Sequence, residues 1–274
     1  MKHQVLGFIG AGNMAASLIS GLIADNYPAD RIWVSDIDEA ALASLAERCG
    51  VNTTTRNATV AEHARILVLA VKPQILRPVV EDLADCLQTR RPLVVSIAAG
   101  ITAASIDRWA GGNMAIVRCM PNTPAMVKTG ATGLCANSGV SEAQRSQAEA
   151  ILRAVGLTVW VGQEAQLDAV TALSGSGPAY FFLMMEAMEE AGVALGLDRE
   201  TARLLSQQTA LGAGRMAIES AEAPAELRRR VTSPGGTTER AIATFEEGGL
   251  SPLVAKAMKA ASHRAAEMSQ QLGA

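Results

Sequence analysis

Short apolar runs alternate with segments of helical spacing along the first half of the chain. Runs that are apolar along their whole length are typical of strands buried on both faces of a sheet. The runs are 5–9, 32–35, 66–71, 93–98 and 114–118. Between them, residues 14–24 and 39–49 carry apolar side chains at helical spacing. The alternation predicts an α/β domain built on a doubly wound parallel sheet.

The second half of the 274-residue chain has little strand signal after a final apolar run at 157–161. The segments that follow are rich in Ala, Leu, Met and Glu, most of which are strong helix formers. The predicted helices are 165–171, 178–195, 199–220 and 252–272. Helices with this much apolar surface need partners. We therefore predict an α/β domain over residues 1–162 and an all-helical domain over residues 163–274 that helps to form an oligomer.

Composition excludes several classes of function. The net charge is −3 and aromatic residues make up 3% of the chain, so nucleic-acid binding is not expected. No apolar stretch is long enough to cross a membrane, and the N-terminus lacks the pattern of a signal peptide. The four cysteines form no C-x-x-C pair, which argues against a metal site and favours a reduced, cytoplasmic compartment. They are Cys49, Cys86, Cys119 and Cys135.

A glycine-rich turn connects the first apolar run to the first helical segment. Gly10, Gly12 and Ala15 fit the pattern G-x-G-x-x-A, in which the glycines allow a tight turn and a close approach of the backbone to a pyrophosphate. The helix that follows would direct its first amide groups at the phosphate charge. The motif predicts a nicotinamide dinucleotide site, and a turn without ligand is the alternative. The cofactor-binding residues expected here are Ile9, Gly10, Ala11, Gly12, Asn13 and Met14.

Asp36 lies at the end of the second apolar run. An acid at this place commonly binds the 2′-hydroxyl of the adenosine ribose and disfavours a 2′-phosphate, which points toward NADH. A role as a helix cap or loop acid is the alternative. Because Arg31 and Arg56 could still receive a phosphate, the choice between NADPH and NADH stays open.

Two further segments end apolar runs that would meet the ligand crevice of an open α/β sheet. The cofactor-binding residues expected in them are Ala70, Val71, Lys72, Pro73, Ile97, Ala98 and Ala99. Asn122 lies between two prolines in a loop after the fifth run, and it could hydrogen-bond the nicotinamide amide or the substrate. A purely structural role for that loop is the alternative.

The distribution of proton donors constrains the substrate. The chain has neither Lys nor His between Lys128 and Lys256. A dehydrogenase that reduces a ketone must deliver a proton to the new alkoxide, often from one of these residues. An imine needs less help, because its nitrogen can arrive protonated and is then already an electrophile. The helical domain therefore favours an imine substrate, oriented by hydroxyls and backbone amides.

Two glycine-rich segments, 173–180 and 231–238, interrupt the predicted helices. In the second, Gly235 and Gly236 expose successive amide groups, and Thr237 and Thr238 add hydroxyls at the expected start of a helix. Such a segment is a plausible nest for a carboxylate. A Pro-Gly turn followed by a threonine cap is the alternative.

Taken together, these segments resemble those of pyrroline-5-carboxylate reductases. The resemblance spans nearly the whole chain, and the run Ser-Pro-Gly-Gly-Thr-Thr is its most specific part. The matching segments are 7–14, 70–73, 96–100, 120–124, 173–180 and 231–246. The resemblance implies a Rossmann domain followed by an all-α dimerisation domain that intertwines with a second subunit. It also implies a homodimer as the minimal unit, and a decamer of five dimers in many members.

The resemblance further implies the reaction and the residues that carry it. The expected reaction is reduction of Δ1-pyrroline-5-carboxylate to L-proline by NADPH or NADH. Asn57 would lie near the adenosine ribose, and Glu164 near the bound ligands. The substrate carboxylate and ring nitrogen would be received at Gly235, Gly236, Thr237 and Thr238, with Thr238 as the catalytic residue. Two positions depart from the family pattern: Asp36 replaces Ser or Thr, and Arg230 replaces Asn or Gln.

Three alternatives remain open from the sequence. β-Hydroxyacid dehydrogenases share the plan of the first half, but they carry a catalytic lysine shortly after a glycine-rich segment like 175–177, and residues 178–188 contain none. A reductase of another cyclic imine would differ in the size of its pocket. A non-catalytic dinucleotide sensor would bind cofactor without turnover.

Overall fold

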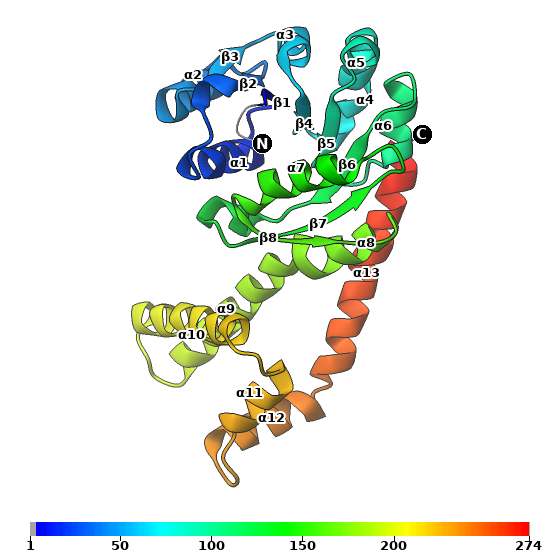
Figure 1. The fold of residues 1–274 in the computed structure, drawn as a ribbon. Coiled ribbons are helices and arrows are strands. Elements are labelled where there is room, and N and C mark those ends of the chain that lie inside the picture. The colour runs from blue at the N-terminus through cyan, green and yellow to red at the C-terminus, as the bar shows by residue number, and fades with distance from the viewer. Residues whose placement is uncertain (1–3, 274) are drawn as a thin grey trace. The chain divides into compact units, whose positions relative to one another are not determined.

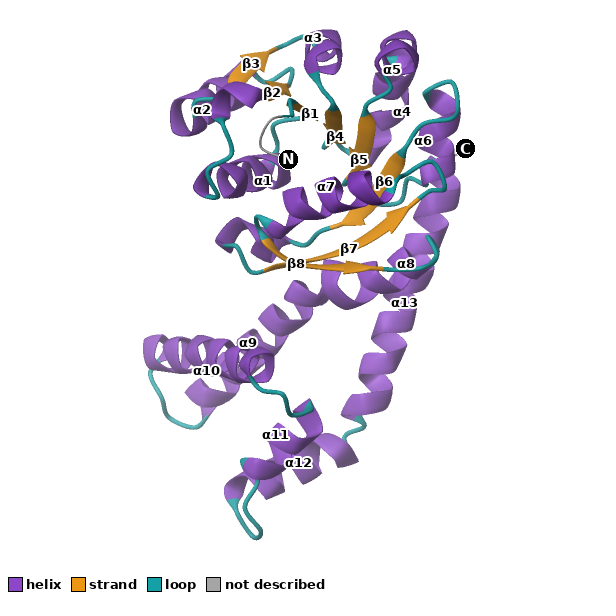
Figure 2. Cartoon of the chain, in the orientation of Figure 1, coloured by secondary structure: helices purple, strands orange, loops and turns teal. Residues whose placement is uncertain are grey.

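The computed structural model describes residues 4–273, which fall into two compact units (Figure 1). The first unit runs to Ser176 and also includes the C-terminal segment from Ala261 onward. The second unit is Gly177–Ala260. The first unit is α/β and the second is all-helical, so the predicted fold class is confirmed (Figure 2).

An 8-stranded sheet forms the centre of the first unit, in the order β3-β2-β1-β4-β5-β6-β7-β8. All neighbouring strands are parallel except β6 and β7, which are antiparallel. The order of the first six strands is that of a doubly wound dinucleotide-binding fold. The strands are β1 Leu6–Ile9, β2 Ile32–Ser35, β3 Asn52–Thr54, β4 Ile66–Leu69, β5 Leu93–Ser96, β6 Ile116–Met120, β7 Gly130–Ala136 and β8 Gly156–Trp160.

Helices cover both faces of this sheet (Figure 2). Because successive side chains of a strand point to opposite faces, Ile66 and Val68 of β4 join one core cluster while Leu67 and Leu69 join the other. Helices α1, α2 and α7 pack on the first cluster, and α3 to α6 on the second. Their bounds are α1 Asn13–Ala24, α2 Glu39–Cys49, α3 Asn57–His63, α4 Pro73–Asp82, α5 Ala84–Arg90, α6 Ala103–Trp109 and α7 Glu142–Arg153.

Two strands, β3 and β7, were not predicted, because their sequences lack a strand pattern. Strand β3 is short and polar, with the sequence Asn-Thr-Thr. Strand β7 contains Gly130 and Gly133, and glycine weakens a strand in isolation. The glycine at 133 is needed for packing, since a Cβ there would lie 2.7 Å from a methyl group of Val170.

The division between the units falls later than the predicted boundary after residue 162. Helix α8 (Gln166–Val170) and the π-helical turn η3 (Thr171–Gly175) follow β8, and buried residues from both belong with the first unit. Leu167 and Val170 approach Gly133 of β7, so this stretch packs on the sheet. The sequence predicts that residues 165–171 are helical, but it contains no pattern that shows whether they pack on the sheet or on the later helices.

The second unit contains the long helices expected for the second half of the chain. Helices α9 and α10 pair, and Ser206 Oγ of α10 donates to the carbonyl of Met185 at 3.1 Å. Arg199, at the start of α10, forms ion pairs with Glu189 and Glu190 of α9. The helices are α9 Gly177–Ala194, α10 Arg199–Glu219, α11 Pro224–Arg230, α12 Thr237–Glu247 and α13 Leu250–Leu272, the last of which ends among residues of the first unit.

Several expectations from composition can be compared with the described residues. Across residues 4–273, no helix has the length and apolar character that a membrane span requires. The same residues hold no cluster of three or more His, Cys, Asp or Glu side chains suited to a metal ion. All four cysteines are unpaired thiols, and burial raises the pKa of Cys119 well above its usual range.

Candidate active site

The turn between β1 and α1 has the backbone that a phosphate loop requires. Gly10 has a φ of +105°, and a Cβ at this position would lie 2.7 Å from the carbonyl oxygen of Ala70. Gly10 is therefore required by the fold itself. Gly12 differs, because its φ of −65° suits any residue and a Cβ there would meet no atom within 4 Å. The open space above Gly12 fits a ligand that approaches the backbone closely.

The first turn of α1 has free backbone amides that could bind an anion. Its N-cap is Gly12, so the cap residue offers no side chain to the first amide groups, and the first turn contains no acidic residue. Amide groups at a helix N-terminus lack intrahelical acceptors and carry partial positive charge. These features suit the pyrophosphate that the sequence motif predicts at this helix start.

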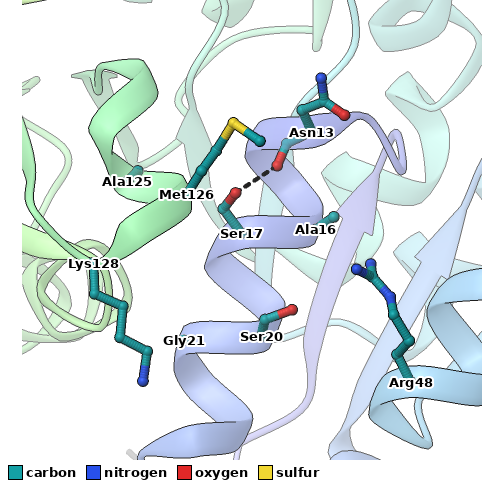
Figure 3. A pocket seen from close by; sticks show the side chains of 9 residues that line it. All are labelled: Asn13, Ala16, Ser17, Ser20, Gly21, Arg48, Ala125, Met126 and Lys128. Carbon is teal, nitrogen blue, oxygen red and sulfur yellow. Dashed lines mark hydrogen bonds between the residues drawn. The ribbon is translucent and has the colours of Figure 1, made fainter. Parts of the chain in front are cut away.

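A pocket of about 230 Å³ lies along α1 next to this turn (Figure 3). Asn13, Ser17 and Ser20 line it from α1, and Arg48 and Lys128 approach it from α2 and from the segment before β7. Within residues 4–273, neither Arg48 nor Lys128 forms an ion pair with a carboxylate. The lining of this pocket therefore includes two cationic side chains and no carboxylate, although the chain as a whole is negative.

Asp36 and Asn57 lie together at the end of β2. The Oδ2 atom of Asp36 accepts a hydrogen bond of 2.7 Å from the amide of Ala11, which orients the carboxylate against the phosphate loop. Asn57 Oδ1 accepts from the hydroxyl of Ser35 at 2.8 Å. The helix-cap role considered for Asp36 belongs to Asp38, whose Oδ1 accepts from the amides of Ala40 and Ala41. The Oδ1 atom of Asp36 accepts from the amide of Asp38 at 3.0 Å, so both carboxylate oxygens bind backbone amides, and a contact with the adenosine ribose stays a prediction.

The segments after β4 and β5 reach the same edge of the sheet as the phosphate loop. Ala70 follows β4 directly, and its amide donates to the carbonyl of Ile9. Lys72 is the N-cap of α4 and Pro73 its first residue, where a proline costs no hydrogen bond. The amide of Ile97 donates to the carbonyl of Leu69, so the segment after β5 is tied to the end of β4. The side chain of Ile9 is fully buried, which limits any ligand contact of Ile9 to its backbone.

Asn122 uses both ends of its side-chain amide within the protein. Its Nδ2 donates to the carbonyl of Ser174 at 2.9 Å, and its Oδ1 accepts from the amide of Ala131 at 2.8 Å. These bonds tie its loop to β7 and to the π-helical turn, and the residue is buried. These two bonds give the loop the structural role considered above. A contact of Asn122 with the nicotinamide amide or the substrate stays a prediction.

The Ser-Pro-Gly-Gly-Thr-Thr segment of the second unit leads into α12. Gly236 is the N-cap of this helix, and the cap residue again lacks a side chain. The amides of the two glycines are already used: Gly235 donates to Glu239 Oε2 and Gly236 donates to the carbonyl of Ser233. Of the predicted nest, only the amides of Thr237 and Thr238 lack an acceptor among the described residues, and binding of a carboxylate there stays a prediction. The Thr238 hydroxyl has no hydrogen-bond partner among the described residues.

Two other residues singled out from the sequence have partners in the structure. Glu164 follows β8, and its Oε1 accepts from the amide of Ala103 at 2.7 Å and from Arg118 Nη1 at 3.2 Å. Its expected contact with a ligand stays a prediction. Arg230 pairs with Glu222 at 2.8 Å, and both side chains are substantially exposed.

Arg118 is a residue near the site that the sequence analysis did not single out. It lies in β6 opposite Ser96 of β5, and only 5% of its surface is exposed. A charged residue is rarely buried without a partner, so an arginine inside an apolar run was a signal that the run met an acid.

Comparisons with known proteins agree with these features. The family model described as "Pyrroline-5-carboxylate reductase dimerisation" matches residues 164–268, and one described as "NADP oxidoreductase coenzyme F420-dependent" matches residues 5–100. A pyrroline-5-carboxylate reductase of Pseudomonas aeruginosa is 54% identical to the chain, with 100% of each covered. A solved pyrroline-5-carboxylate reductase from Coxiella burnetii has 50% identity and a TM-score of 0.94, covering 97% of this chain and 98% of its own.

A further solved structure shows the fold with cofactor. The pyrroline carboxylate reductase of Plasmodium falciparum, with NADP bound, has 29% identity and a TM-score of 0.85, covering 98% of this chain and 99% of its own. These matches extend over both units of the chain. This chain belongs to the pyrroline-5-carboxylate reductase family.

Proposed function

We propose that the protein reduces Δ1-pyrroline-5-carboxylate to L-proline, the last step of proline biosynthesis, with NADPH or NADH as the reductant. The observation that carries the proposal is the start of α12, a helix N-terminus without a side-chain cap, where the Thr238 hydroxyl has no hydrogen-bond partner among the described residues. Glu239 of the same turn binds the amide of Gly235. The amides suit the carboxylate of the substrate. The hydroxyl suits a ring nitrogen, because it can both donate and accept a hydrogen bond.

The residues of the first unit fit a nicotinamide dinucleotide. Gly12 leaves room for the pyrophosphate, the amides at the start of α1 would bind it, and Asp36 with Asn57 would receive the adenosine ribose. The segments 70–73 and 97–99 would line the nicotinamide half. The bound cofactor would supply the hydride for the imine carbon, C2 of the pyrroline ring.

In this mechanism the protein acts mainly by placement. The amides at the start of α12 hold the substrate carboxylate, and the Thr238 hydroxyl hydrogen-bonds the ring nitrogen. The nitrogen can enter protonated, so no lysine or histidine is required as a proton donor, in keeping with their absence between Lys128 and Lys256. The rate enhancement then comes from orientation and from the charge of the iminium.

The test is oxidation of the reduced cofactor by purified protein with Δ1-pyrroline-5-carboxylate, followed by its absorbance with NADH and NADPH in parallel. Rapid oxidation with proline as the product supports the proposal. Turnover only with a six-membered cyclic imine would show that this imine, and not Δ1-pyrroline-5-carboxylate, is the substrate. Cofactor binding without turnover on any imine would favour a sensor.

Asp36 is expected to set the preference between the two cofactors. Asp36→Ser removes the negative charge beside the ribose, so the ratio of kcat/KM for NADPH over NADH is expected to rise by about tenfold or more, on the order of 1.4 kcal/mol. Parallel kinetics with the two cofactors measure this ratio. The control is Asp38→Ala, which removes the cap of α2 and is expected to lower stability by about 1 kcal/mol without changing the ratio. An unchanged ratio in Asp36→Ser would show that this carboxylate does not face the ribose.

A homo-oligomer follows from the dimerisation family that residues 164–268 match. We propose that the minimal unit is a dimer and that five dimers assemble into a decamer. We also propose that the protein acts in the cytoplasm. Helix α9 supports a subunit interface, because Phe181, Phe182 and Leu183 are each more than 60% exposed in the single chain. Light scattering coupled to gel filtration is expected to give the mass of ten chains. A mass of two chains would support the dimer and contradict the decamer. A mass of one chain would contradict both.

A further inference from the structure

The C-terminal turn of the chain, residues 268–273, lies against the loop between β5 and α6. This loop begins at Ile97, directly after β5, and ends at Thr102, the N-cap of α6. Both segments belong to the first compact unit. Because residues 97–99 are those proposed to line the nicotinamide half, the C-terminal turn packs on a loop that carries part of the proposed cofactor site.

The first contact is apolar and lies at Gly100, inside the loop. Gly100 has a φ of +74°, in the left-handed region that favours glycine. A Cβ added there would lie 3.3 Å from the Cβ of Met268 and 3.7 Å from Cδ1 of Leu272. Leu272 also packs against the core cluster that contains Ala98 and Ile101. The end of α13 therefore fits closely against the backbone of the loop.

The second contact is polar and is made by the carbonyl of Gly273. This carbonyl accepts from Ser105 Oγ at 2.8 Å and from Arg108 Nη2 at 2.7 Å. Ser105 Oγ lies 2.9 Å from Thr102 Oγ1, which accepts from the amide of Ser105 at 3.1 Å. A hydroxyl has a single proton to donate, so Ser105 gives its proton to Gly273 and receives that of Thr102. The carbonyl thus ends a hydrogen-bonded chain that begins at the N-cap of α6.

The burial of Ser105 makes this chain of hydrogen bonds consequential. Ser105 is only 4% exposed, so water is a poor substitute for the acceptor that Gly273 provides. A buried hydroxyl that loses its acceptor costs about 1–3 kcal/mol. The bonds therefore favour one arrangement of the start of α6 and of the loop that leads into it.

We propose that the C-terminal turn is a positioning element for the cofactor. By packing on Gly100 and holding the cap of α6, it keeps the β5–α6 loop in the conformation in which residues 97–99 receive the nicotinamide half. It acts through this loop and not by contact with the cofactor. The inference rests on the proposed function only in taking residues 97–99 as part of the cofactor site.

Ser105→Ala tests the polar contact and leaves every residue of the loop unchanged. The dissociation constants for NADPH and NADH, measured by calorimetry without substrate, are expected to rise about three- to tenfold. The kcat at saturating cofactor and substrate is expected to stay within about twofold of wild type, because the filled site holds the loop in place. Deletion of residues 268–274 removes both contacts, and its effect on the dissociation constants is expected to exceed that of Ser105→Ala.

A matched control comes from Ser206 of the second unit. Ser206 is 5% exposed, and its Oγ donates to the carbonyl of Met185 at 3.1 Å, so it also joins two elements through a buried serine hydroxyl. Ser206→Ala is expected to lower Tm to a similar extent as Ser105→Ala and to leave both cofactor dissociation constants unchanged.

Three outcomes would overturn the inference. Unchanged dissociation constants in Ser105→Ala and in the deletion variant, with only Tm lowered, would give the turn a purely structural role. An equal loss of affinity in Ser206→Ala would assign the effect to general destabilisation. A fall in kcat at unchanged cofactor affinity would place the effect on the reaction and not on binding. A wild-type protein that binds cofactor but lacks turnover would contradict the proposed function and leave this inference standing.

Discussion

Replacing Gly12 with valine is expected to remove NADPH and NADH binding while leaving the protein folded. The backbone of Gly12 has φ −65° and ψ 175°, which any residue adopts, and an added Cβ meets no atom within 4 Å. The fold thus tolerates a side chain, which would occupy the space where a pyrophosphate approaches the backbone. We expect the cofactor dissociation constant to rise about 100-fold or more, on the order of 3 kcal/mol, with little change in Tm.

Gly10→Ala is the informative comparison. At Gly10 the φ is +105° and the added Cβ lies 2.7 Å from the carbonyl oxygen of Ala70, so the ends of β1 and β4 must separate. This variant is expected to lose stability, by about 1–3 kcal/mol, as well as cofactor affinity. Calorimetric titration and thermal unfolding on both variants separate the two effects. Full cofactor affinity in Gly12→Val would mean that the dinucleotide does not cross the start of α1.

The Thr238→Ala variant is expected to lose between about 10-fold and 100-fold in kcat/KM, corresponding to ~1–3 kcal/mol of transition-state stabilisation. The hydroxyl of Thr238 has no partner among the described residues, so its removal breaks no bond within the chain. Stability and cofactor affinity are therefore expected to stay close to wild type. Steady-state kinetics with Δ1-pyrroline-5-carboxylate, at saturating cofactor, provide the measurement.

Two controls narrow the interpretation of this loss. Thr238→Ser keeps a hydroxyl and is expected to recover most of the activity. Thr244→Ala removes a hydroxyl from the same helix, but that hydroxyl already donates to the carbonyl of Arg240 at 3.0 Å, so kcat/KM is expected to be unaffected. A Thr238→Ala protein with full kcat/KM would contradict the proposed role of this hydroxyl.

Much of the fold was accessible from local pattern. Strands β1, β2, β4, β5, β6 and β8 were predicted because each is a short apolar run, and the long helices of the second unit because their residues favour helix. Strand β7 was missed because Gly133 packs against α8 and Gly130 against Ala125 and Val155, contacts that no local pattern records. The antiparallel pairing of β7 with β6 was missed for the same reason.

The candidate site divides in a similar way. The phosphate loop and the start of α12 were predicted because special backbone positions require glycine and helix starts have a recognisable composition. The structure narrowed the predicted nest, since the amides of Gly235 and Gly236 already have acceptors. It also showed both polar ends of Asn122 engaged within the protein.

The sequence by itself determined the α/β and all-helical halves, the dinucleotide motif and the shortage of proton donors that favours an imine. These features depend on residue type and on spacing within a few turns, which are readable along the chain. The tertiary structure alone decided the environment of Glu164 and the place of the C-terminal segment. Glu164 meets Ala103 across 61 positions, and Gly273 meets Ser105 across 168. Such partners are chosen by how the elements pack in space, because no local periodicity links residues so far apart.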